Sequence, residues 1–374
     1  DHIINNVLDK LAEMGFKNLT LAASSLSAVH APLIEHIRSG LITHIETSGL
    51  RGELAEQISR GLMDFPVVFR SHGGRASAIR SGELHIDVAF LGAPSCDPYG
   101  NANGYSRDDD DGISCGSLGY ARTDAEFADK VIIITNNIVS YPNAPWAIPE
   151  HDVDYVVRVD DIGDPKGIMS GATRYTKDPK ELLIAKTAAN VVEAAGYLYD
   201  GFSMQMGSGG ASLATARFIR QKMLDKGIRC RFALGGITGQ ITAMHEEGLI
   251  DRILDVQSFD LDAAKSLKNN HFHHQISATY YASHLVATAA EQLDFVILSA
   301  LEIDTDFNVN VLTGSDGVIR GAIGGHPDTA ESASLAVIVA PLVRGRIPTV
   351  VEHVGTVVTP GSVIAVSYTH LRAH

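Results

Sequence analysis

The sequence predicts an α/β protein whose two similar lobes each contain an open, mainly parallel sheet. Three observations support this fold class: the length of 374 residues, a recurring order of strand, glycine turn and helix, and an internal repeat. The length exceeds what one hydrophobic core usually holds, which favours two lobes. Strands that alternate with helices are typical of parallel sheets.

The first lobe shows this order directly. Residues 18–23 predict a buried strand, Ser24 and Ser25 a turn, and residues 31–39 a helix. A second strand over residues 42–47 is followed by a glycine-bearing turn and another helix. Two strands joined through a helix in this way are expected to lie parallel.

The same order returns in the second lobe, where residues 203–206 and 230–234 predict strands and residues 207–210 a turn. Glycines of the turns match at a spacing of 187 positions. This spacing relates Gly49, Gly52 and Gly61 to Gly236, Gly239 and Gly248.

A longer polar repeat relates residues 86–103 to residues 293–310 at a spacing of 207 positions. Its polar matches are Asp87, Asp97, Asn101 and Asn103 with Asp294, Asp304, Asn308 and Asn310. Polar residues that recur in register are harder to explain by chance than apolar ones, which any parallel strand supplies. The repeat favours duplication over two lobes that converged on similar turns. We expect the two equivalent strand ends to face one cleft from both sides.

Composition excludes several classes of protein. The formal net charge of −14 disfavours a broad nucleic-acid surface, although it permits a local cationic pocket. No apolar run reaches the roughly 18 residues of a membrane span. Cys96, Cys115 and Cys230 lack zinc-ligand spacing, which favours a reducing cytoplasm and no structural metal. Asp1 stands within a predicted helix, so we expect the chain to begin partway through its natural protein.

Glycine turns are the first candidate ligand sites, because the P-loop, zinc-protease and nucleophile-elbow motifs are all absent. Gly207, Ser208 and Gly209, and Gly235 with Gly236, could present backbone N–H groups to a phosphate or carboxylate. A purely structural turn is an equally good interpretation of either segment.

Residues 70–75 form the best candidate anion pocket of the first lobe. The segment contains two arginines, one histidine and two glycines: Arg70, Ser71, His72, Gly73, Gly74 and Arg75. An arginine fork matches a carboxylate or phosphate through two hydrogen bonds. The alternative is a surface loop with solvated arginines.

The densest polar segment, residues 301–328, follows a strongly apolar strand. Open α/β sheets usually bind ligands at the carboxyl ends of their strands, which favours a site here. Its candidate residues are Glu302, Asp304, Asn308, Arg320, Gly324, Gly325, His326 and Asp328. His326 and Asp328 suit orientation of a ligand or proton transfer. An Asp- and Asn-rich turn sealed by glycines is the alternative.

Two further clusters are interpreted as structural. The acidic run over residues 108–111 is expected to be a solvated loop, because neighbouring carboxylates repel one another. His271, His273 and His274 cannot all converge on one metal ion, because neighbouring side chains on a strand alternate between its faces.

Several of these motifs together resemble the alpha subunits of citrate lyase, within the coenzyme A transferase superfamily. The segments that carry the resemblance are Phe69 to Ala76, Val88 to Asp97, Asn101 to Gly104, Leu234 to Gly239, Ile253 to Asp260 and Leu301 to Thr329. The resemblance extends from about residue 5 to about residue 362. It implies two coenzyme A transferase-like lobes, with the first lobe truncated at its N-terminus.

The resemblance implies that citrate replaces acetate on an acyl-carrier thioester. It also implies a beta subunit that cleaves the citryl group, and a gamma acyl carrier with a dephospho-coenzyme A-type prosthetic group. No cofactor or metal is expected on this subunit, and the complex is expected in the cytoplasm. Related transferases use a covalent glutamate, whose position falls near residues 257–259, where this chain has no Glu. We therefore expect direct attack through a mixed anhydride, with Glu246, Glu247 and Glu302 as the glutamates to examine.

Site roles are expected in three groups. Glu302, Asp304 and His326 are the candidate catalytic residues. Substrate binding is assigned to Arg70, Ser71, His72, Gly73, Gly74, Arg75, Asn308 and Arg320. Thioester binding is assigned to Gly207, Ser208, Gly209, Gly235, Gly236, Gly324, Gly325 and Asp328.

The expected domains are residues 1–167, residues 168–363 and a tail over residues 364–374, which does not continue the family's final strand and reads as non-native. A citramalate lyase alpha subunit, or a glutamate-dependent coenzyme A transferase or hydrolase, remains the alternative enzyme. A non-catalytic sensing lobe is disfavoured, because no basic helix-turn-helix segment is present.

Overall fold

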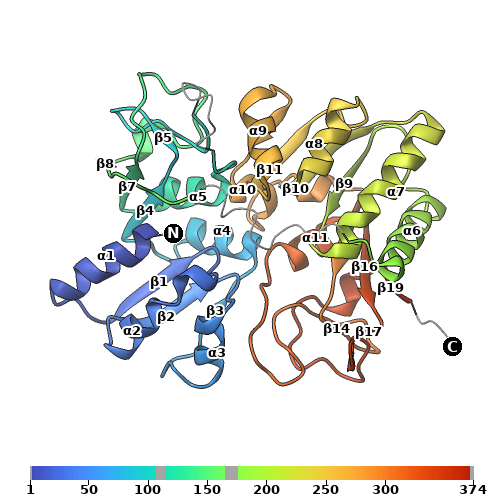
Figure 1. Cartoon of the computed structure of the whole chain (residues 1–374), viewed down its shortest axis with the longest axis horizontal. Coiled ribbons are helices and arrows are strands. Elements are labelled where there is room, and N and C mark those ends of the chain that lie inside the picture. Colours follow the sequence, from blue (N-terminus) through green and yellow to red (C-terminus); the bar gives the residue numbers. More distant parts are fainter. Residues whose placement is uncertain (1, 107–113, 165–175, 371–374) are drawn as a thin grey trace.

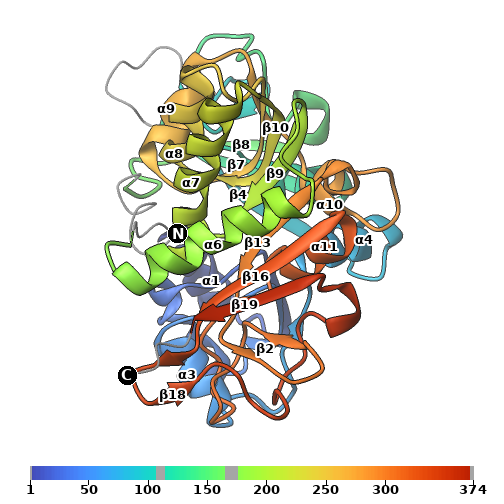
Figure 2. The ribbon, with the colours of Figure 1, turned by 90° about the vertical axis from the view of Figure 1, so that its right-hand side faces the viewer.

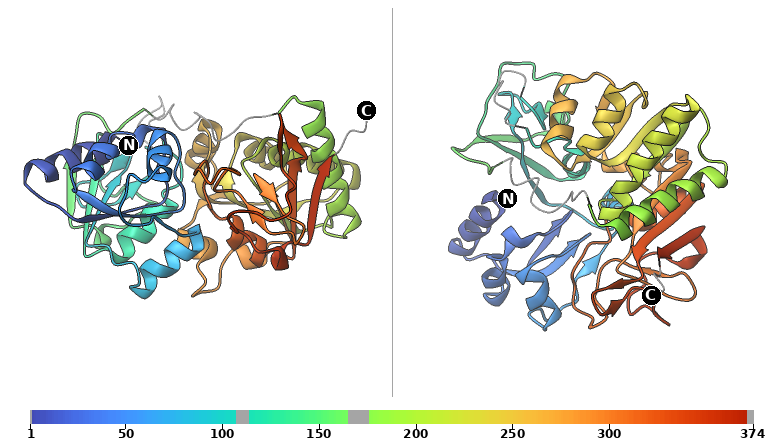
Figure 3. Two further views of the ribbon diagram at one scale, coloured as in Figure 1. Left: turned by 90° about the horizontal axis from the view of Figure 1, so that it is seen from below. Right: turned by 45° about the vertical axis from the view of Figure 1, so that its right-hand side comes forward.

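The computed structural model describes residues 2–106, 114–164 and 176–370. We refer to residues 2–164 as the first half and to residues 176–370 as the second half. Figures 1 and 3 show the first half, in blue to teal, beside the second half, in green to red. Each half contains parallel strands and covering helices, so the predicted fold class of two α/β lobes is confirmed.

The second half is built on one seven-stranded sheet, which Figure 2 shows with helix α6 crossing it. The strand order is β12-β11-β10-β9-β13-β16-β19, and every pairing is parallel. The strands are β9 (Phe202–Met206), β10 (Cys230–Ile237), β11 (Ile253–Ser258), β12 (His273–Gln275), β13 (Phe295–Ser299), β16 (Leu335–Pro341) and β19 (Val366–His370). All five residues of β9 are buried, as expected of a parallel strand covered on both faces.

The helices of this half are α6 (Pro179–Ala194), α7 (Gly210–Lys226), α8 (Gly239–Glu246), α9 (Leu261–Asn269), α10 (Ala278–Ala282) and α11 (His326–Ser332). Helix α6 begins where the sequence provides an N-cap, because the Asp178 carboxylate accepts from the Lys180 N–H and Pro179 occupies the first turn. Helix α7 ends at Gly227, whose φ of +64° is the left-handed conformation that glycine adopts easily.

The first half contains two separate parallel sheets, β1-β2-β3 and β4-β7-β8. Their strands are β1 (Leu19–Ala23), β2 (Ile42–Thr47), β3 (Val68–Phe69), β4 (Val88–Gly92), β7 (Lys130–Thr135) and β8 (Tyr155–Arg158). The helices are α1 (His2–Glu13), α2 (Leu33–Arg38), α3 (Glu53–Ser59), α4 (His72–Ser81) and α5 (Gly119–Phe127). Short two-stranded ribbons complete the chain: β5 (Ser95–Cys96) with β6 (Ala102–Asn103), β14 (Glu302–Ile303) with β15 (Val309–Asn310), and β17 (Val343–Arg344) with β18 (Ile347–Pro348).

The repeat at 207 positions is structural. Strand β4 corresponds to β13, ribbon β5-β6 to ribbon β14-β15, and α5 to α11, all at this spacing. The hydrogen bonds repeat as well: Asp97 Oδ1 accepts from the Asn101 N–H at 3.1 Å, and Asp304 Oδ1 accepts from the Asn308 N–H at 2.9 Å. The predicted equivalence of these two strand ends is therefore confirmed. These four residues do not line the cavity described below, so the expectation that both ends face one cleft is not supported.

The predicted glycine match at 187 positions is wrong. Elements from α1 to α4 correspond in order to elements from α7 to α10, and their first residues lie 205 to 211 positions apart. Helix α3, which follows Gly52, therefore matches α9 and not α8. The physical reason is that a glycine turn follows strand after strand in this fold, so a shift by one element also superposes glycines.

Strand β9 consequently has no counterpart among the described residues of the first half. In the second half it lies between β10 and β13, whose counterparts β1 and β4 belong to different sheets. Asp294 accepts from the Ser203 N–H of β9 at 2.7 Å, whereas its counterpart Asp87 has a side chain that is 89% exposed. The truncation of the first lobe remains a prediction.

The two halves meet through backbone contacts. Gly49 forms an antiparallel bridge with Ala322, and the Leu50 N–H donates to the Gly321 carbonyl at 3.2 Å. A Cβ on Gly49 would lie 2.3 Å from Cβ of Ala322, so only glycine permits this approach. The contact holds the loop after β2 against the loop before α11.

The tail includes a strand of the second-half sheet. Val366–His370 form β19, which pairs in parallel with β16. That this segment does not continue the family's final strand stays a prediction. Its non-native origin remains a prediction, and the predicted boundary at residue 168 lies outside the described residues. No helix in the described part of the chain is both long enough and apolar enough to cross a membrane.

Candidate active site

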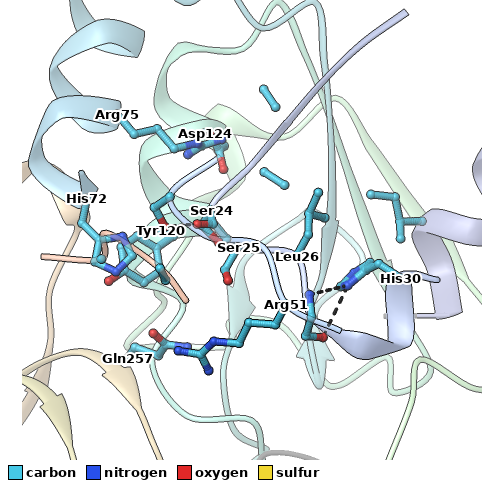
Figure 4. A pocket seen from close by; sticks show the side chains of 18 of the residues that line it. Ser24, Ser25, Leu26, His30, Arg51, His72, Arg75, Tyr120, Asp124 and Gln257 are labelled. Atoms are coloured by element: carbon cyan, nitrogen blue, oxygen red, sulfur yellow. Dashed lines mark hydrogen bonds and ion pairs between the residues drawn. The ribbon is translucent and has the colours of Figure 1, made fainter. Parts of the chain in front are cut away.

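A cavity of about 1900 Å³ is lined by residues of both halves. One region is apolar and is lined by α1, β1 and β4. The other is polar and lies where the two halves meet, as Figure 4 shows. Polar residues of this region include Ser24, Ser25, Arg51, His72, Arg75, Tyr120, Asp124, Gln205, Gln257 and Tyr281. The polar region is our candidate active site.

His72 begins helix α4 and lines the candidate active site, as predicted. Its ring lies against Tyr120, with 4.5 Å between the ring centroids. Burial lowers the pKa of His72 to about 4; nearby Asp328 opposes this shift and Arg75 reinforces it. The ring is therefore neutral near pH 7, and its buried Nδ1 has no hydrogen-bond partner in the described residues. A neutral imidazole with a free ring nitrogen can hydrogen-bond a bound ligand.

Arg75 lies one turn further along α4, also within the cavity lining. It is 4% exposed and its Nη2 lies 2.8 Å from Asp124 Oδ1, so the charge of its guanidinium is already balanced. Burial raises the pKa of Asp124, whereas the Arg75 guanidinium opposes that shift. Arg75 Nε has no acceptor among the described residues and remains available to a ligand.

Arg51 and Gln257 were not assigned to the site from the sequence. Arg51 follows the Gly49 bridge, and Gln257 stands near the end of β11 in the other half. Both line the cavity, and in Figure 4 the Arg51 side chain extends toward Gln257. Within the described chain the Arg51 guanidinium has no ion-pair or hydrogen-bond partner. For Arg51, its position in a glycine turn directly after a strand was the feature of the sequence that could have indicated a site residue.

Gly207, Ser208 and Gly209, which were assigned to thioester binding, line the cavity at the start of α7. The Gly207 N–H donates to the Ile297 carbonyl at 2.7 Å and so belongs to the sheet. Gly209 is the N-cap of α7 and provides no side-chain cap. The N–H groups of the first turn of this 17-residue helix can therefore serve an anionic ligand.

Gly324 and Gly325, which precede α11, belong to the cavity lining. Gly236 of strand β10 belongs to it as well. Gly235 does not, because its φ of +101° and the neighbouring Gln205 side chain give it a packing function. A Cβ on Gly236 would lie 2.0 Å from the Phe259 ring, so this glycine too is required by packing.

Arg70 lies outside the lining and is engaged in ion pairs. Its Nε lies 2.7 Å from Glu46 and its Nη1 lies 3.0 Å from Glu83. Gly73 and Gly74 lie outside as well, and a Cβ on Gly73 would lie 2.0 Å from the Ala282 carbonyl oxygen. The geometry therefore shows structural contacts for these residues and does not support the predicted contact with substrate.

Ser71 and Asp328 connect the two halves beneath the cavity, outside its lining. The Ser71 hydroxyl donates to Asp328 Oδ1 at 2.5 Å and accepts from the Gly74 N–H at 2.9 Å. Asp328 Oδ2 accepts from the Gly73 N–H at 2.8 Å. The Asp328 carboxylate thus caps α4 from the second half, where negative charge is favoured.

Glu302, Asp304 and Asn308 also lie outside the lining, which does not support the predicted catalytic and substrate-binding roles. Glu302 is buried and accepts from Asn310 Nδ2 at 2.9 Å and from the Ser315 hydroxyl at 2.5 Å. Burial of Asp304 alone would raise its pKa. Hydrogen bonds from Asn308, Val354 and neighbouring N–H groups outweigh this effect and lower it. Asp304 stabilises the turn between β14 and β15, and Glu302 connects β14 to Asn310 of β15 and to Ser315 beyond it.

His326 lines the cavity, but both of its ring nitrogens are engaged. Nδ1 lies 2.7 Å from the Thr359 hydroxyl, and Nε2 lies 3.0 Å from the Ser299 carbonyl oxygen. Because a carbonyl only accepts, Nε2 carries the proton and Nδ1 accepts from Thr359. Burial lowers the pKa of His326 to about 4, so the ring is neutral near pH 7. These bonds support a positioning role over the predicted proton transfer.

Arg320 lines the cavity as predicted, although its Nη2 also lies 2.5 Å from Asp316. Cys115 lies in the lining too, and burial raises the pKa of its thiol to about 12. The thiol is therefore protonated near pH 7 and is a poor nucleophile.

Metal ligands were not expected. Within the described ranges, ligand atoms of His85, Asp87 and Asp129 lie within 4.8 Å of one another, on exposed side chains. His273 is buried against Asp255 and His274 is exposed, as the alternating faces of a strand predict. The acidic run at residues 108–111 lies outside the described residues.

Solved structures define the class of protein. At 16% identity, a 4-hydroxybutyrate coenzyme A transferase from Porphyromonas gingivalis has a TM-score of 0.58, with 98% of this chain and 89% of that chain covered. A Pseudomonas malonate decarboxylase hetero-tetramer in complex with malonate has a TM-score of 0.76 at 16% identity, with 97% of this chain and 73% of that chain covered. These likenesses show the fold, which is that of coenzyme A transferase-like proteins.

Relatives of higher identity define the family. The family described as "Citrate lyase, alpha subunit (CitF)" matches residues 1–372. The chain is 61% identical to the citrate lyase alpha chain of Haemophilus influenzae, over 96% of this chain and 72% of the relative. It is 57% identical to the citrate lyase alpha chain of Escherichia coli K12, over 99% of this chain and 72% of the relative. A Streptococcus mutans structure, described as an alpha subunit of citrate lyase in complex with citrate, has a TM-score of 0.95 at 56% identity, covering 99% and 72%.

The chain belongs to the citrate lyase alpha subunit family and is an enzyme of the coenzyme A transferase type. The resemblance stated from the sequence motifs is thereby confirmed.

Proposed function

We propose that the chain exchanges acetate for citrate on an acyl-carrier thioester. Acetyl-carrier and citrate give citryl-carrier and free acetate. Family membership supports the substrate class, and the cavity between the halves provides a site with both polar and apolar walls. The carrier is a small gamma subunit with a dephospho-coenzyme A-type group, and a beta subunit then cleaves the citryl group. This subunit itself needs no metal or redox cofactor for the exchange.

The exchange proceeds through a mixed anhydride. A citrate carboxylate oxygen attacks the thioester carbonyl carbon, the carbon–sulfur bond breaks, and the thiolate leaves. The thiolate then attacks the citryl carbonyl of the anhydride, and acetate leaves as the carbon–oxygen bond breaks. Both steps need oriented reactants and donors for a developing oxyanion. The first turn of α7 offers such N–H groups.

One observation carries the proposal of direct attack: the described lining of the cavity contains no glutamate. Gln257 occupies the region where glutamate-dependent transferases were expected to carry their nucleophile. Glu302 is buried in strand β14, where it accepts from Asn310, and Glu247 pairs with Arg220 at 2.6 Å. Glu246 also lies outside the lining. A glutamyl thioester would need a carboxylate inside the cavity.

The decisive measurement is a trapping experiment. The chain is incubated with acetyl-carrier, then with hydroxylamine or borohydride, and its peptides are examined by mass spectrometry. We expect release of acetate on addition of citrate and no modified glutamate. A hydroxamate on any Glu, together with ping-pong kinetics with free coenzyme A, would establish a glutamate-dependent transferase instead. Parallel assays with citrate and citramalate separate the two acid substrates.

A further inference from the structure

The exchange poses a problem of discrimination between acids. The incoming acid and the leaving acetate both present one reacting carboxylate to the thioester. Citrate differs from acetate only in groups remote from the reacting centre, above all in its two further carboxylates. A site that selects citrate therefore needs a cation that the reacting carboxylate does not use.

Few permanent cations line the described part of the cavity, and they are Arg51, Arg75 and Arg320. Arg75 is buried and balanced by Asp124, at 2.8 Å. Arg320 is half-exposed and paired with Asp316. Arg51 alone among the three has no acidic partner in the described chain. His72 and His326 are neutral near pH 7, because burial lowers the pKa of each to about 4.

The backbone fixes the position of this unbalanced cation. Arg51 stands two residues after Gly49, and Arg320 stands two residues before Ala322, the bridge partner of Gly49. The two arginines therefore leave the same short antiparallel contact, one from each half. Because Arg320 is already paired with Asp316, Arg51 is the arginine of this contact whose charge remains available to an anion.

Gln257 explains why Arg51 stays unbalanced. Its side chain lies on the opposite wall, toward which Arg51 extends in Figure 4, and an amide carries no charge. A glutamate at this position would form an ion pair with the guanidinium and neutralise it. The uncharged amide at position 257 therefore leaves the Arg51 guanidinium available to a ligand.

We propose that Arg51, aided by Arg320, binds a non-reacting carboxylate of the incoming acid and so selects a polycarboxylate over a monocarboxylate. This inference rests on the proposed exchange. A guanidinium is suited to the task because its planar fork binds a carboxylate through two hydrogen bonds.

The test compares two acceptor acids on the same acetyl thioester. Values of kcat/KM are measured for citrate and for propionate, with Arg51→Gln beside the wild type. We expect the citrate-to-propionate ratio to fall about 10- to 100-fold, as expected for loss of a charged hydrogen bond. Arg51→Lys should retain part of the ratio, and Gln257→Glu should lower it. A ratio that stays within twofold of wild type in Arg51→Gln and Gln257→Glu overturns the proposal.

A binding measurement keeps the inference separate from the proposed reaction. Isothermal titration with citrate, without any thioester, should show affinity in the wild type and a loss of about 10-fold or more in Arg51→Gln. Arg38→Gln is the matched control, because Arg38 is exposed, paired with Glu35 and outside the cavity. A chain that binds citrate through Arg51 but releases no acetate would refute the exchange and leave the binding site in place. Equal citrate affinity in wild type and Arg51→Gln would refute the binding site.

Discussion

Replacing Asp328 by alanine should loosen the contact between the halves more than any surface substitution. The Asp328 side chain is 1% exposed and accepts from both the Ser71 hydroxyl and the Gly73 N–H. Hydrogen bonds to a charged group contribute about 1.5–3 kcal/mol each, so losing two should cost about 3–6 kcal/mol in the free energy of unfolding. Asp328→Asn keeps one oxygen acceptor and should cost less.

Urea unfolding followed by circular dichroism measures this cost. Asp316→Ala is the control, because Asp316 is an exposed carboxylate and its ion pair with Arg320 is exposed as well. We expect the midpoint of Asp328→Ala to fall well below that of the control. Equal midpoints for the two variants would show that the Asp328 contacts do not hold the halves together.

The pH dependence provides a second check on Asp328. A hydrogen bond from His284 to Asp328 raises the pKa of His284, with Nε2 and Oδ1 3.1 Å apart. A raised pKa in the folded state means that this contribution is complete below the unfolded pKa of about 6.5. It is lost as the pH rises through the folded pKa. The stability difference between wild type and Asp328→Ala should therefore shrink from pH 6 toward pH 8, and a difference that grows over this range contradicts the pairing.

Three further predictions concern single sites. Arg75→Ala should raise the citrate requirement more than the carrier requirement, and equal kinetic effects on both substrates count against the substrate-binding role. The substitution should also lower the free energy of unfolding by about 3–5 kcal/mol, because it leaves Asp124 buried and unpaired, and calorimetry measures this loss. Gly49→Ala should lower the melting temperature, because its Cβ would overlap Ala322 at a cost of about 1–3 kcal/mol. Ala322→Gly should restore only part of the loss, because the new Cβ would still lie 2.9 Å from the Cα of residue 322. His326 has a pKa lowered to about 4 from an unfolded value of about 6.5, so its contribution to stability is present above pH 6.5 and lost between pH 6.5 and 4. His326→Asn should flatten stability across that window in a pH series of unfolding curves, and an unchanged slope would refute the neutral buried state.

Candidate residues were easier to find along the chain than to rank. The segment from residue 70 to 75 was recognised as functional, yet only His72 and Arg75 line the cavity. Helical spacing decides this, since α4 turns Gly73 against α10 while it directs His72 into the site. Arg70 precedes the helix and pairs with Glu46 instead.

The polar turn at residues 302–308 shows a second limit of sequence reasoning. Asp304 and Asn308 repeat because they build the same turn twice, as Asp97 and Asn101 do in the first half. A carboxylate that caps backbone N–H groups and one that faces a ligand have the same letter in the sequence. Only the positions of the neighbouring N–H groups distinguish them.

Local order and periodicity indicated the fold class and the duplication at 207 positions, because buried strands, helix caps and glycine turns are short-range features of the chain. The resemblance of particular motifs indicated the family. Tertiary structure alone decided the register of the first repeat, since adjacent elements carry similar glycines. It alone also paired Gly49 with Ala322 and placed Arg51 and Gln257 in the lining of one cavity, because the residues of each pair are more than 200 positions apart in the sequence. The polar region of the cavity lies where the two halves meet, and no single segment of the sequence encodes it.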